Sequence, residues 1–168
     1  MKIDINDVLV SDGEAFSAEY SGSFAEVTFQ GQRYEFADGV HVKADYFLGN
    51  EDEDILVTGS FEADTSVSCS KCLKEFMYTV SFKFTEYYKK NPEETDYAYE
   101  GYSIDLSQML QDNLILSLPS RHVCEQTCKG LCSICGNDNN LQQCDCAQHV
   151  DESNPFYGLS ELIDDEEV

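Results

Sequence analysis

The chain has 168 residues, of which 33 are acidic and ten are basic, so its formal net charge at pH 7 is −23. A hydrophobic content of 42%, with ten Phe and ten Tyr, excludes a wholly disordered chain and predicts a folded core. The charge disfavours broad binding to RNA or DNA, because Lys and Arg side chains supply most of the affinity for phosphate backbones.

Alternating apolar and polar residues predict β-strands through most of residues 1–90. Two short segments predict a hairpin around Gly31, and residues 40–48 and 55–61 both alternate with period two. In residues 76–84 the aromatic side chains all fall on one face, which is more typical of a core than of a base-stacking platform. An antiparallel sheet or a small barrel is therefore expected.

Residues 86–102 contain Pro92 and an acidic cluster and show no regular period, so they are expected to form a long connection. After them, Asp105 can cap a helix that ends before Pro119 and covers the sheet. The apolar stripe of this helix comprises Leu106, Met109, Leu110 and Leu114.

The chain is predicted to contain three regions. Residues 1–120 form a β-rich domain with one covering helix, and residues 121–150 form a cysteine-rich module that resembles a zinc ribbon. Residues 151–168 form a short helix, which begins at Asn154 and Pro155, and an acidic tail. The expected fold class is α+β and mainly β.

The chain shows no run of about 18 apolar residues and no signal-peptide pattern, so we predict a cytoplasmic protein without a membrane span. In that reducing compartment, cysteines bind metal or carry out redox chemistry more often than they form disulfides.

All eight cysteines fall into four close pairs, a pattern typical of proteins that bind tetrahedral metal ions. In chain order the pairs are Cys69 and Cys72, Cys124 and Cys128, Cys132 and Cys135, and Cys144 and Cys146. The third pair precedes a glycine that permits a sharp turn, and the fourth pair is its nearest complement, so these two pairs predict one compact site. The first two pairs remain, and they predict a second site that ties the strand region to the cysteine-rich module. The alternative is one filled site with four spare thiols.

Four thiolate ligands suit both zinc and iron–sulfur clusters, but the spacing of these pairs favours zinc. Two zinc ions are expected, and each would be structural, because four sulfurs leave no open position for water. The chemical alternative is a redox role, in which an activated Cys-x-x-Cys thiol exchanges disulfides.

Four of the ten basic residues lie within three positions of a cysteine, and they are Lys71, Lys74, Arg121 and Lys129. Their simplest role is to offset the charge of the thiolates, and the alternative is a small basic contact spot for a partner. His122 and His149 are expected to be surface residues rather than metal ligands, and His41 lies on the polar side of its strand. No motif typical of a catalytic site is present, so no enzyme activity is expected.

Four segments, in this order, resemble the YceD family, a former domain of unknown function found in bacteria and plastids. They are CSKCLKEF at 69–76, LILSLPS at 114–120, CEQTCKGLCSICGNDNN at 124–140 followed by CDC, and NPFYGLSEL at 154–162. Lys71 stands where arginine is common in the family, which keeps the charge but loses the planar guanidinium. The resemblance implies a role in ribosome biogenesis and in accumulation of large-subunit ribosomal RNA, without an enzymatic activity. It also implies that the gene often lies beside that of a small protein of the large ribosomal subunit.

These observations predict a non-enzymatic assembly factor that binds a basic ribosomal protein, or a large-subunit assembly particle through such a protein. A thiol switch, in which oxidants eject zinc and the freed module changes partner, is an alternative of another class. Direct binding of ribosomal RNA by the few basic residues near the cysteines is a third hypothesis, which the net charge disfavours.

Overall fold

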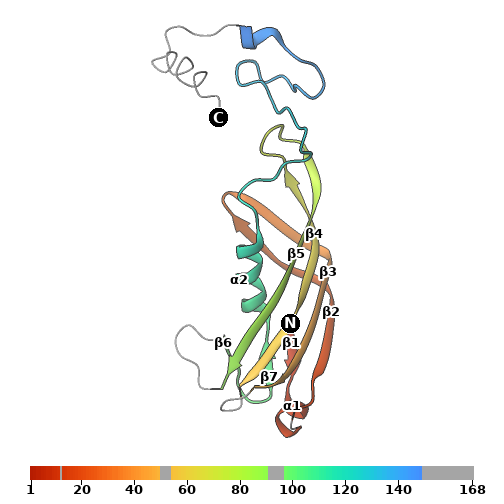
Figure 1. The fold of residues 1–168 in the computed structure, drawn as a ribbon, viewed down its shortest axis with the longest axis vertical. Coiled ribbons are helices and arrows are strands. Elements are labelled where there is room, and N and C mark those ends of the chain that lie inside the picture. The colour runs from red at the N-terminus through yellow and green to blue at the C-terminus, as the bar shows by residue number, and fades with distance from the viewer. Residues whose placement is uncertain (12, 50–53, 91–96, 149–168) are drawn as a thin grey trace, which may run out of the picture. The chain divides into compact units, whose positions relative to one another are not determined.

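The computed structural model describes most of the chain, and its elements are labelled in Figure 1. The described residues are 1–11, 13–49, 54–90 and 97–148. Their elements are, in chain order, β1 (Lys2–Asp4), α1 (Asn6–Val10), β2 (Phe16–Phe29), β3 (Gln32–Leu48), β4 (Ile55–Ser68), β5 (Glu75–Lys89), β6 (Tyr97–Ala98), β7 (Ser103–Asp105), α2 (Ser107–Ser117) and a 3-10 turn, η1 (Asp145–Gln148). The predicted C-terminal helix, the acidic tail and His149 lie outside the described residues.

The described chain divides into two compact units. The first unit holds Met1–Ser68 and Glu75–His122, and therefore the strands and α2. The second unit holds Cys69–Lys74 and the chain from Val123, and therefore all eight cysteines. The loop between β4 and β5 thus groups with the cysteine-rich segment rather than with the strands that flank it.

Five strands of the first unit form one sheet in the order β2-β3-β4-β5-β6. The first four are antiparallel neighbours, and the short strand β6 pairs in parallel with the end of β5. Figure 1 shows that the long strands curl, so that the sheet forms a half-barrel with α2 against it. The prediction of a mainly β fold with an antiparallel sheet and one covering helix is confirmed.

The alternation predicted for the strands decides which side chains face the core. In β3, Val40, Val42 and Ala44 are buried, while His41 and Lys43 between them are exposed, as predicted. The aromatic side chains of residues 76–84 in β5 pack into the same core, so the prediction that they are core residues rather than a base-stacking platform is confirmed.

The predicted hairpin around Gly31 is the turn between β2 and β3. Phe29 pairs with Gln32, and the two residues between them, Gln30 and Gly31, have φ of 49° and 81°. Positive φ at both central positions characterises a type I′ turn, whose twist matches that of the flanking strands. Register shifts on either side of Phe24 then bend this strand pair.

A glycine in β4 allows neighbouring strands to approach closely. Gly59 lies opposite Ala44 of β3 and Phe84 of β5. A Cβ atom at this position would lie 2.0 Å from the carbonyl oxygen of Lys43 and 2.7 Å from Cζ of Phe84. The sheet can therefore take this curl only with a residue that has no side chain here.

One strand pair in the first unit is not visible in the sequence pattern. β1 pairs antiparallel with β7, and Ile3 lies opposite Ile104 with both side chains buried. Each of these strands has only three residues, which is too few to show a period.

The predicted long connection over residues 86–102 is wrong in extent. β5 continues to Lys89, and β6 lies inside the predicted loop. The reason is aromatic packing: Tyr88 is buried, and the ring of Tyr97 stacks on it with centroids 5.6 Å apart. Burial of these rings outweighs the local turn signals.

α2 ends at Ser117, before Pro119, as predicted. Asp105 accepts a hydrogen bond from the N–H of Ser107 at 3.0 Å, and hydrogen bonds from Ser107 lower the pKa of the Asp105 carboxyl. None of the described helices has the length and apolarity needed to cross a bilayer. The predicted stripe is wholly buried and comprises Leu106, Met109, Leu110 and Leu114.

His122 is buried, so the prediction of a surface position is wrong. Its Nε2 lies 2.8 Å from the hydroxyl of Tyr34, and its ring packs edge-on against Tyr78 with centroids 4.5 Å apart. These partners come from β3 and β5, which are distant in sequence, so local pattern carries no sign of them. Burial lowers the pKa of His122.

Lowering the pH is expected to destabilise the first unit through His122. The unfolded chain binds a proton near the ordinary pKa of 6.5, whereas the folded chain binds it only at lower pH, so the free energy of unfolding falls as pH drops below 6.5. We expect urea unfolding of the metal-free protein to lose stability more steeply between about pH 7 and pH 5 in the wild type than in His122→Gln. Tyr34→Phe keeps the buried imidazole and should retain the steeper slope, and equal slopes in wild type and His122→Gln would contradict this account.

Candidate functional site

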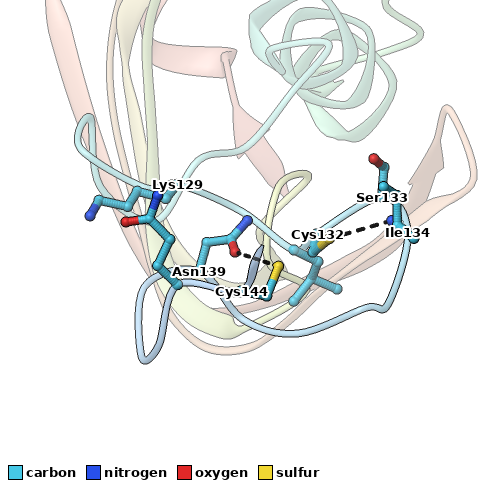
Figure 2. Close-up of a pocket in the computed structure, with 8 residues that line it drawn as sticks. Lys129, Cys132, Ser133, Ile134, Asn139 and Cys144 are labelled. Atoms are coloured by element: carbon cyan, nitrogen blue, oxygen red, sulfur yellow. Dashed lines mark hydrogen bonds between the residues drawn. The ribbon is translucent and has the colours of Figure 1, made fainter. Parts of the chain in front are cut away.

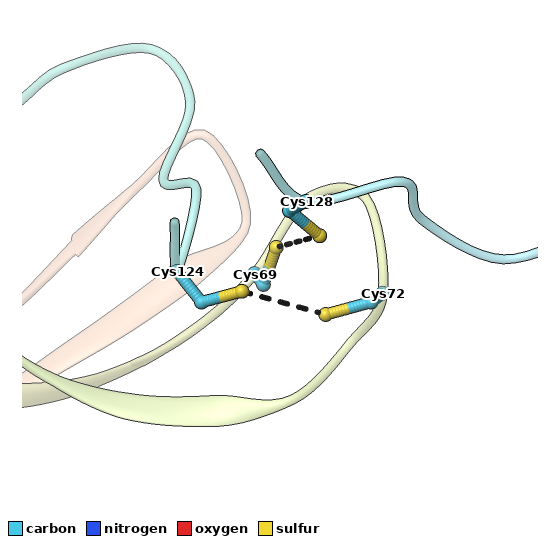
Figure 3. Close-up of side chains that lie close together, drawn as sticks. All are labelled: Cys69, Cys72, Cys124 and Cys128. Atoms are coloured by element: carbon cyan, nitrogen blue, oxygen red, sulfur yellow. Dashed lines mark hydrogen bonds between the residues drawn. The ribbon is translucent and has the colours of Figure 1, made fainter. Parts of the chain in front are cut away.

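The loop between β4 and β5 carries the first cysteine pair. The N–H of Leu73 donates to the carbonyl of Cys69 at 2.9 Å, and the N–H of Cys69 donates to the carbonyl of Lys74 at 2.9 Å. The N–H of Lys71 lies 3.4 Å from Sγ of Cys69. This first cysteine loop (Cys69–Lys74) thus directs a backbone N–H at a sulfur and places Cys69 and Cys72 close together (Figure 3).

The third cysteine pair lies in a second cysteine loop (residues 132–137) that has the same three bonds. The N–H of Gly136 donates to the carbonyl of Cys132 at 2.9 Å, and the N–H of Cys132 donates to the carbonyl of Asn137 at 2.8 Å. The N–H of Ile134 lies 3.4 Å from Sγ of Cys132. Both loops turn at a residue of positive φ, which is 73° here and 62° at the equivalent residue of the first loop. The chain therefore contains two copies of one Cys-x-x-Cys turn.

The first two cysteine pairs converge, as Figure 3 shows. We call them the first cysteine group, and its members are Cys69, Cys72, Cys124 and Cys128. All four sulfurs lie within 4.8 Å of one another. The distance from Cys69 to Cys128 Sγ is 3.9 Å, and that from Cys72 to Cys124 Sγ is 3.7 Å. A tetrahedral ion with metal–sulfur bonds of about 2.3 Å holds its ligands about 3.8 Å apart, so these sulfurs suit such an ion.

The remaining two pairs form the second cysteine group, whose members are Cys132, Cys135, Cys144 and Cys146. Their sulfurs also lie within 4.8 Å of one another. Two of these cysteines line a cavity of about 420 Å³, together with Lys129 and Asn139 (Figure 2). None of the four is buried, and Cys135 is exposed, whereas three members of the first group are buried. The two groups therefore differ in their access to solvent.

The structure brings the eight predicted ligands together in the two sets that the cysteine spacing predicts. Each set can hold a metal ion. That these residues bind metal in solution stays a prediction.

Backbone N–H groups hold one thiol of each group close to ionisation. Burial opposes ionisation of Cys69, but hydrogen bonds from backbone N–H groups, foremost that of Cys124, lower its pKa to about 6. Backbone N–H groups, foremost that of Cys135, lower the pKa of Cys132 to about 6. Contact with neighbouring thiols, foremost Cys135, raises the pKa of Cys146 to about 12. A metal ion must displace the remaining protons, so its affinity rises with pH.

The chain after Cys128 packs against the first cysteine loop. The N–H of Leu131 donates to the carbonyl of Lys71 at 2.9 Å, and Nζ of Lys71 donates to the carbonyl of Cys128 at 3.3 Å. Gly130 has φ of 73°, and a Cβ atom there would lie 2.9 Å from the carbonyl oxygen of Lys71. Only glycine fits this approach. Sequence reasoning missed Gly130, because its requirement comes from a segment far away in the chain.

The predicted basic contact residues divide between the units. Lys71, Lys74 and Lys129 are exposed in the second unit, and Arg121 is exposed in the first. The described part of the second unit carries three lysines and three acidic residues, which balance before any thiolate charge is added. The amine of Lys71 donates to the carbonyl of Cys128, a member of the first cysteine group. That this lysine offsets thiolate charge stays a prediction.

Replacing Leu73 by glycine is expected to stabilise the second unit. A left-handed backbone costs a non-glycine residue about 1–2 kcal/mol, and the Leu73 side chain is 67% exposed and has little packing to lose. We expect Leu73→Gly to raise the free energy of unfolding of the metal-loaded protein by about 1 kcal/mol, measured by urea unfolding. The matched change Gly136→Leu, at the same place in the second loop, should lower it by at least as much. Destabilisation by Leu73→Gly would show that the leucine has a packing role.

A family model described as "Large ribosomal RNA subunit accumulation protein YceD" matches residues 57–163. The chain belongs to the YceD family. The match includes both cysteine groups and most of the hairpin that carries the first pair. The family is named for accumulation of ribosomal RNA and not for a catalysed reaction.

Curated relatives of this YceD-family chain include uncharacterized proteins of Mycobacterium tuberculosis and Mycobacterium bovis. Each is 32% identical over 106 residues, which cover 58% of the chain and 51% of the relative. The chain thus spans about half the length of these relatives. A protein of Arabidopsis thaliana named "Large ribosomal RNA subunit accumulation protein YCED homolog 1, chloroplastic" is 34% identical over 55 residues, or 33% of the chain and 16% of that protein. No solved structure matches.

Proposed function

We propose that this YceD-family chain is a non-enzymatic ribosome biogenesis factor of the cytoplasm that supports accumulation of large-subunit ribosomal RNA. It does so by binding a basic ribosomal protein, or an assembly intermediate of the large subunit through such a protein. The observation that carries this proposal is the family match over residues 57–163, which spans both cysteine groups.

The charge of the sheet supports a basic partner. Two basic residues of β3, Arg33 and Lys43, pair with three acidic side chains. Four more acidic side chains exposed on strands β2 to β5, those of Asp45, Glu62, Asp64 and Glu75, have no ion pair among the described residues. Such a surface attracts a cationic segment and repels the phosphates of RNA, which favours a protein partner over RNA. Among the side chains that the structure describes, the seven exposed acidic residues of β2 to β5 are Glu19, Glu26, Glu35, Asp45, Glu62, Asp64 and Glu75.

The cofactor we propose is zinc, with one ion in each cysteine group. The sulfur spacing of the first group supports one tetrahedral ion, because all four sulfurs lie within 4.8 Å of one another and two of the distances between them are 3.9 and 3.7 Å. The spacing of the cysteine pairs along the chain favours zinc as that ion. Four thiolates leave no position for water, so a bound ion would hold the shape of the second unit.

The test of partner binding is capture of purified ribosomal proteins and large-subunit precursor particles at low and high salt. We expect the wild type to retain a basic ribosomal protein at low salt and to lose it as salt rises, because exposed charges are screened. A variant with Glu62→Lys, Asp64→Lys and Glu75→Lys should bind at least about tenfold more weakly.

A control variant changes the net charge equally from positions outside the sheet. It carries Asp7→Lys, Glu14→Lys and Glu100→Lys, all at exposed residues. If the control weakens binding as much as the sheet variant, net charge rather than the sheet attracts the partner. If the wild type ignores ribosomal proteins and particles at low salt, the proposed function is lost. Repeating the capture with a chelator tests whether binding needs metal.

A thiol switch is the second candidate, and the exposure of the second cysteine group favours it. Mild peroxide should then release zinc and reversibly unfold the second unit, with the exposed Cys135 oxidised before the buried Cys69. Direct contact of RNA with Lys71 and Lys129 stays a prediction. It would be supported by RNA affinity that falls steeply with salt and is lost on Lys71→Ala and Lys129→Ala.

A further inference from the structure

Two adjacent asparagines reach both cysteine groups. The side-chain nitrogen Nδ2 of Asn140 lies 3.6 Å from Sγ of Cys128, which belongs to the first group. The side-chain oxygen Oδ1 of Asn139 lies 3.8 Å from Sγ of Cys144, which belongs to the second group (Figure 2). One dipeptide therefore touches a ligand of each predicted metal ion.

The dipeptide is anchored to the chain that leaves the first group. Oδ1 of Asn140 accepts a hydrogen bond from the N–H of Lys129 at 2.7 Å. The N–H of Asn139 donates to the carbonyl of Gly130 at 3.0 Å. Because Lys129 and Gly130 directly follow Cys128, a shift of this ligand is passed to both asparagines.

The dipeptide is also continuous with the second cysteine loop. Cys132 donates its N–H to the carbonyl of Asn137, and Leu131 forms a bridge with Asp138. Asp138 in turn accepts a hydrogen bond from Nδ2 of Asn140 at 2.7 Å. Ordering of this loop around an ion therefore also orders the amide that faces the first group.

The amides suit metal-bound sulfurs. A thiolate on a metal ion is an acceptor, and an N–H that points at it offsets its negative charge. Asn140 already has its nitrogen next to Cys128. Cys144 donates to the oxygen of Asn139 while it is a thiol, and once it has lost its proton the same amide can present its nitrogen after a half rotation.

We infer that Asn140, together with Asn139, is a positioning residue shared by both cysteine groups, so that metal binding in one group strengthens metal binding in the other. This inference rests on the proposed metal binding. Loss of a group that hydrogen-bonds to a metal ligand typically changes metal affinity by about 10- to 100-fold, which sets the size of the effect to look for.

The test is a Co²⁺ titration of the full chain, followed by visible absorption of the cobalt thiolate. Cys144→Ser with Cys146→Ser removes the second group and leaves the first. We expect this removal to weaken Co²⁺ binding at the first group by about tenfold. In a chain that carries Asn140→Ala, the same removal should not weaken Co²⁺ binding at the first group any further, because the amide that links the two groups is already absent.

Two further variants distinguish loss of the contact between Asn140 and Cys128 from misfolding of the variant protein. Asn140→Asp keeps the acceptor for the N–H of Lys129 but loses the donor to Cys128, so it should also lose the coupling. Gln143→Ala, at an exposed residue in the same segment, should keep it. If Asn140→Ala does not fold, Asn140→Asp decides the question.

The outcomes distinguish failure of the coupling from failure of the proposed metal sites. Two ions that bind with affinities independent of each other would overturn the coupling and leave the proposed metal sites standing. An Asn140→Asp variant that remains coupled like Gln143→Ala would also overturn it. A wild-type chain that binds no Co²⁺ would overturn both the coupling and the metal sites.

Discussion

Chelation of the metal is expected to unfold the second unit while the first unit keeps its structure. The described part of the second unit has no apolar core: Ile134 and Leu141, for example, are exposed. Structural zinc contributes about 10–16 kcal/mol of apparent binding free energy at pH 7, which is comparable to the stability of a whole domain. The first unit has its own apolar core between the sheet and α2, so its stability is expected not to depend on an ion. The buried side chains in the described part of the second unit are those of Cys69, Cys72 and Cys128.

Amide hydrogen exchange, with and without chelator, checks this expectation. Protection should disappear in the two cysteine loops and remain in β2 to β5. Cys128→Ser, at a buried cysteine of the first group, should have a larger effect than Cys135→Ser, at an exposed cysteine of the second. Full protection of the cysteine loops in demonstrably metal-free protein would mean that the ions are dispensable for their shape.

Gly59→Ala is expected to be the most damaging single-methyl change in the sheet. The added carbon would lie 2.0 Å from the backbone oxygen of Lys43, and a backbone atom cannot move aside as the end of a flexible side chain can. Overpacking of this kind typically costs about 1–3 kcal/mol, and contact with backbone places this case at the upper end. We expect a loss of about 3 kcal/mol in the free energy of unfolding of the first unit.

Thermal unfolding checks this value, since about 3 kcal/mol lowers the Tm of a domain of this size by more than about 10 °C. The control is Ser60→Ala, which changes the next residue of β4, on the opposite face of the strand. That variant should stay within about 0.5 kcal/mol of the wild type. Equal stability of the two variants would mean that the strands can separate at Gly59 without cost.

Sequence reasoning finds elements whose signal is local and repeated. Residues 40–48 alternate because one face of β3 is buried, and the stripe of Met109, Leu110 and Leu114 is the buried face of α2. It fails where the signal is short or comes from distant partners. β1 and β7 are too short to show a period, and His122 is buried by β3 and β5.

The same division holds for the candidate site. Cysteine spacing predicts four pairs and their grouping, because each short turn must place two sulfurs on one side. The residues that surround the sulfurs are not predictable in this way. Gly130 and Asn140 owe their roles to the close approach of segments that are separate in the chain. Leu73 occupies the position that Gly136 has in the equivalent turn, and the sequence alone does not show that Leu73 has a positive φ.

The position of the first cysteine loop, between β4 and β5, sets the order in which the two groups can close during synthesis. Cys124 follows Cys72 by 52 residues, and a ribosome that adds about 5–20 residues per second needs about 3–10 s to make them. In that interval the remaining strands, α2 and His122 are synthesised, so the hairpin of β4 and β5 that carries the loop can pair before its partner cysteines are made. The first group is complete at Cys128 and the second only at Cys146. During synthesis, therefore, the buried first group is completed before the more exposed second group.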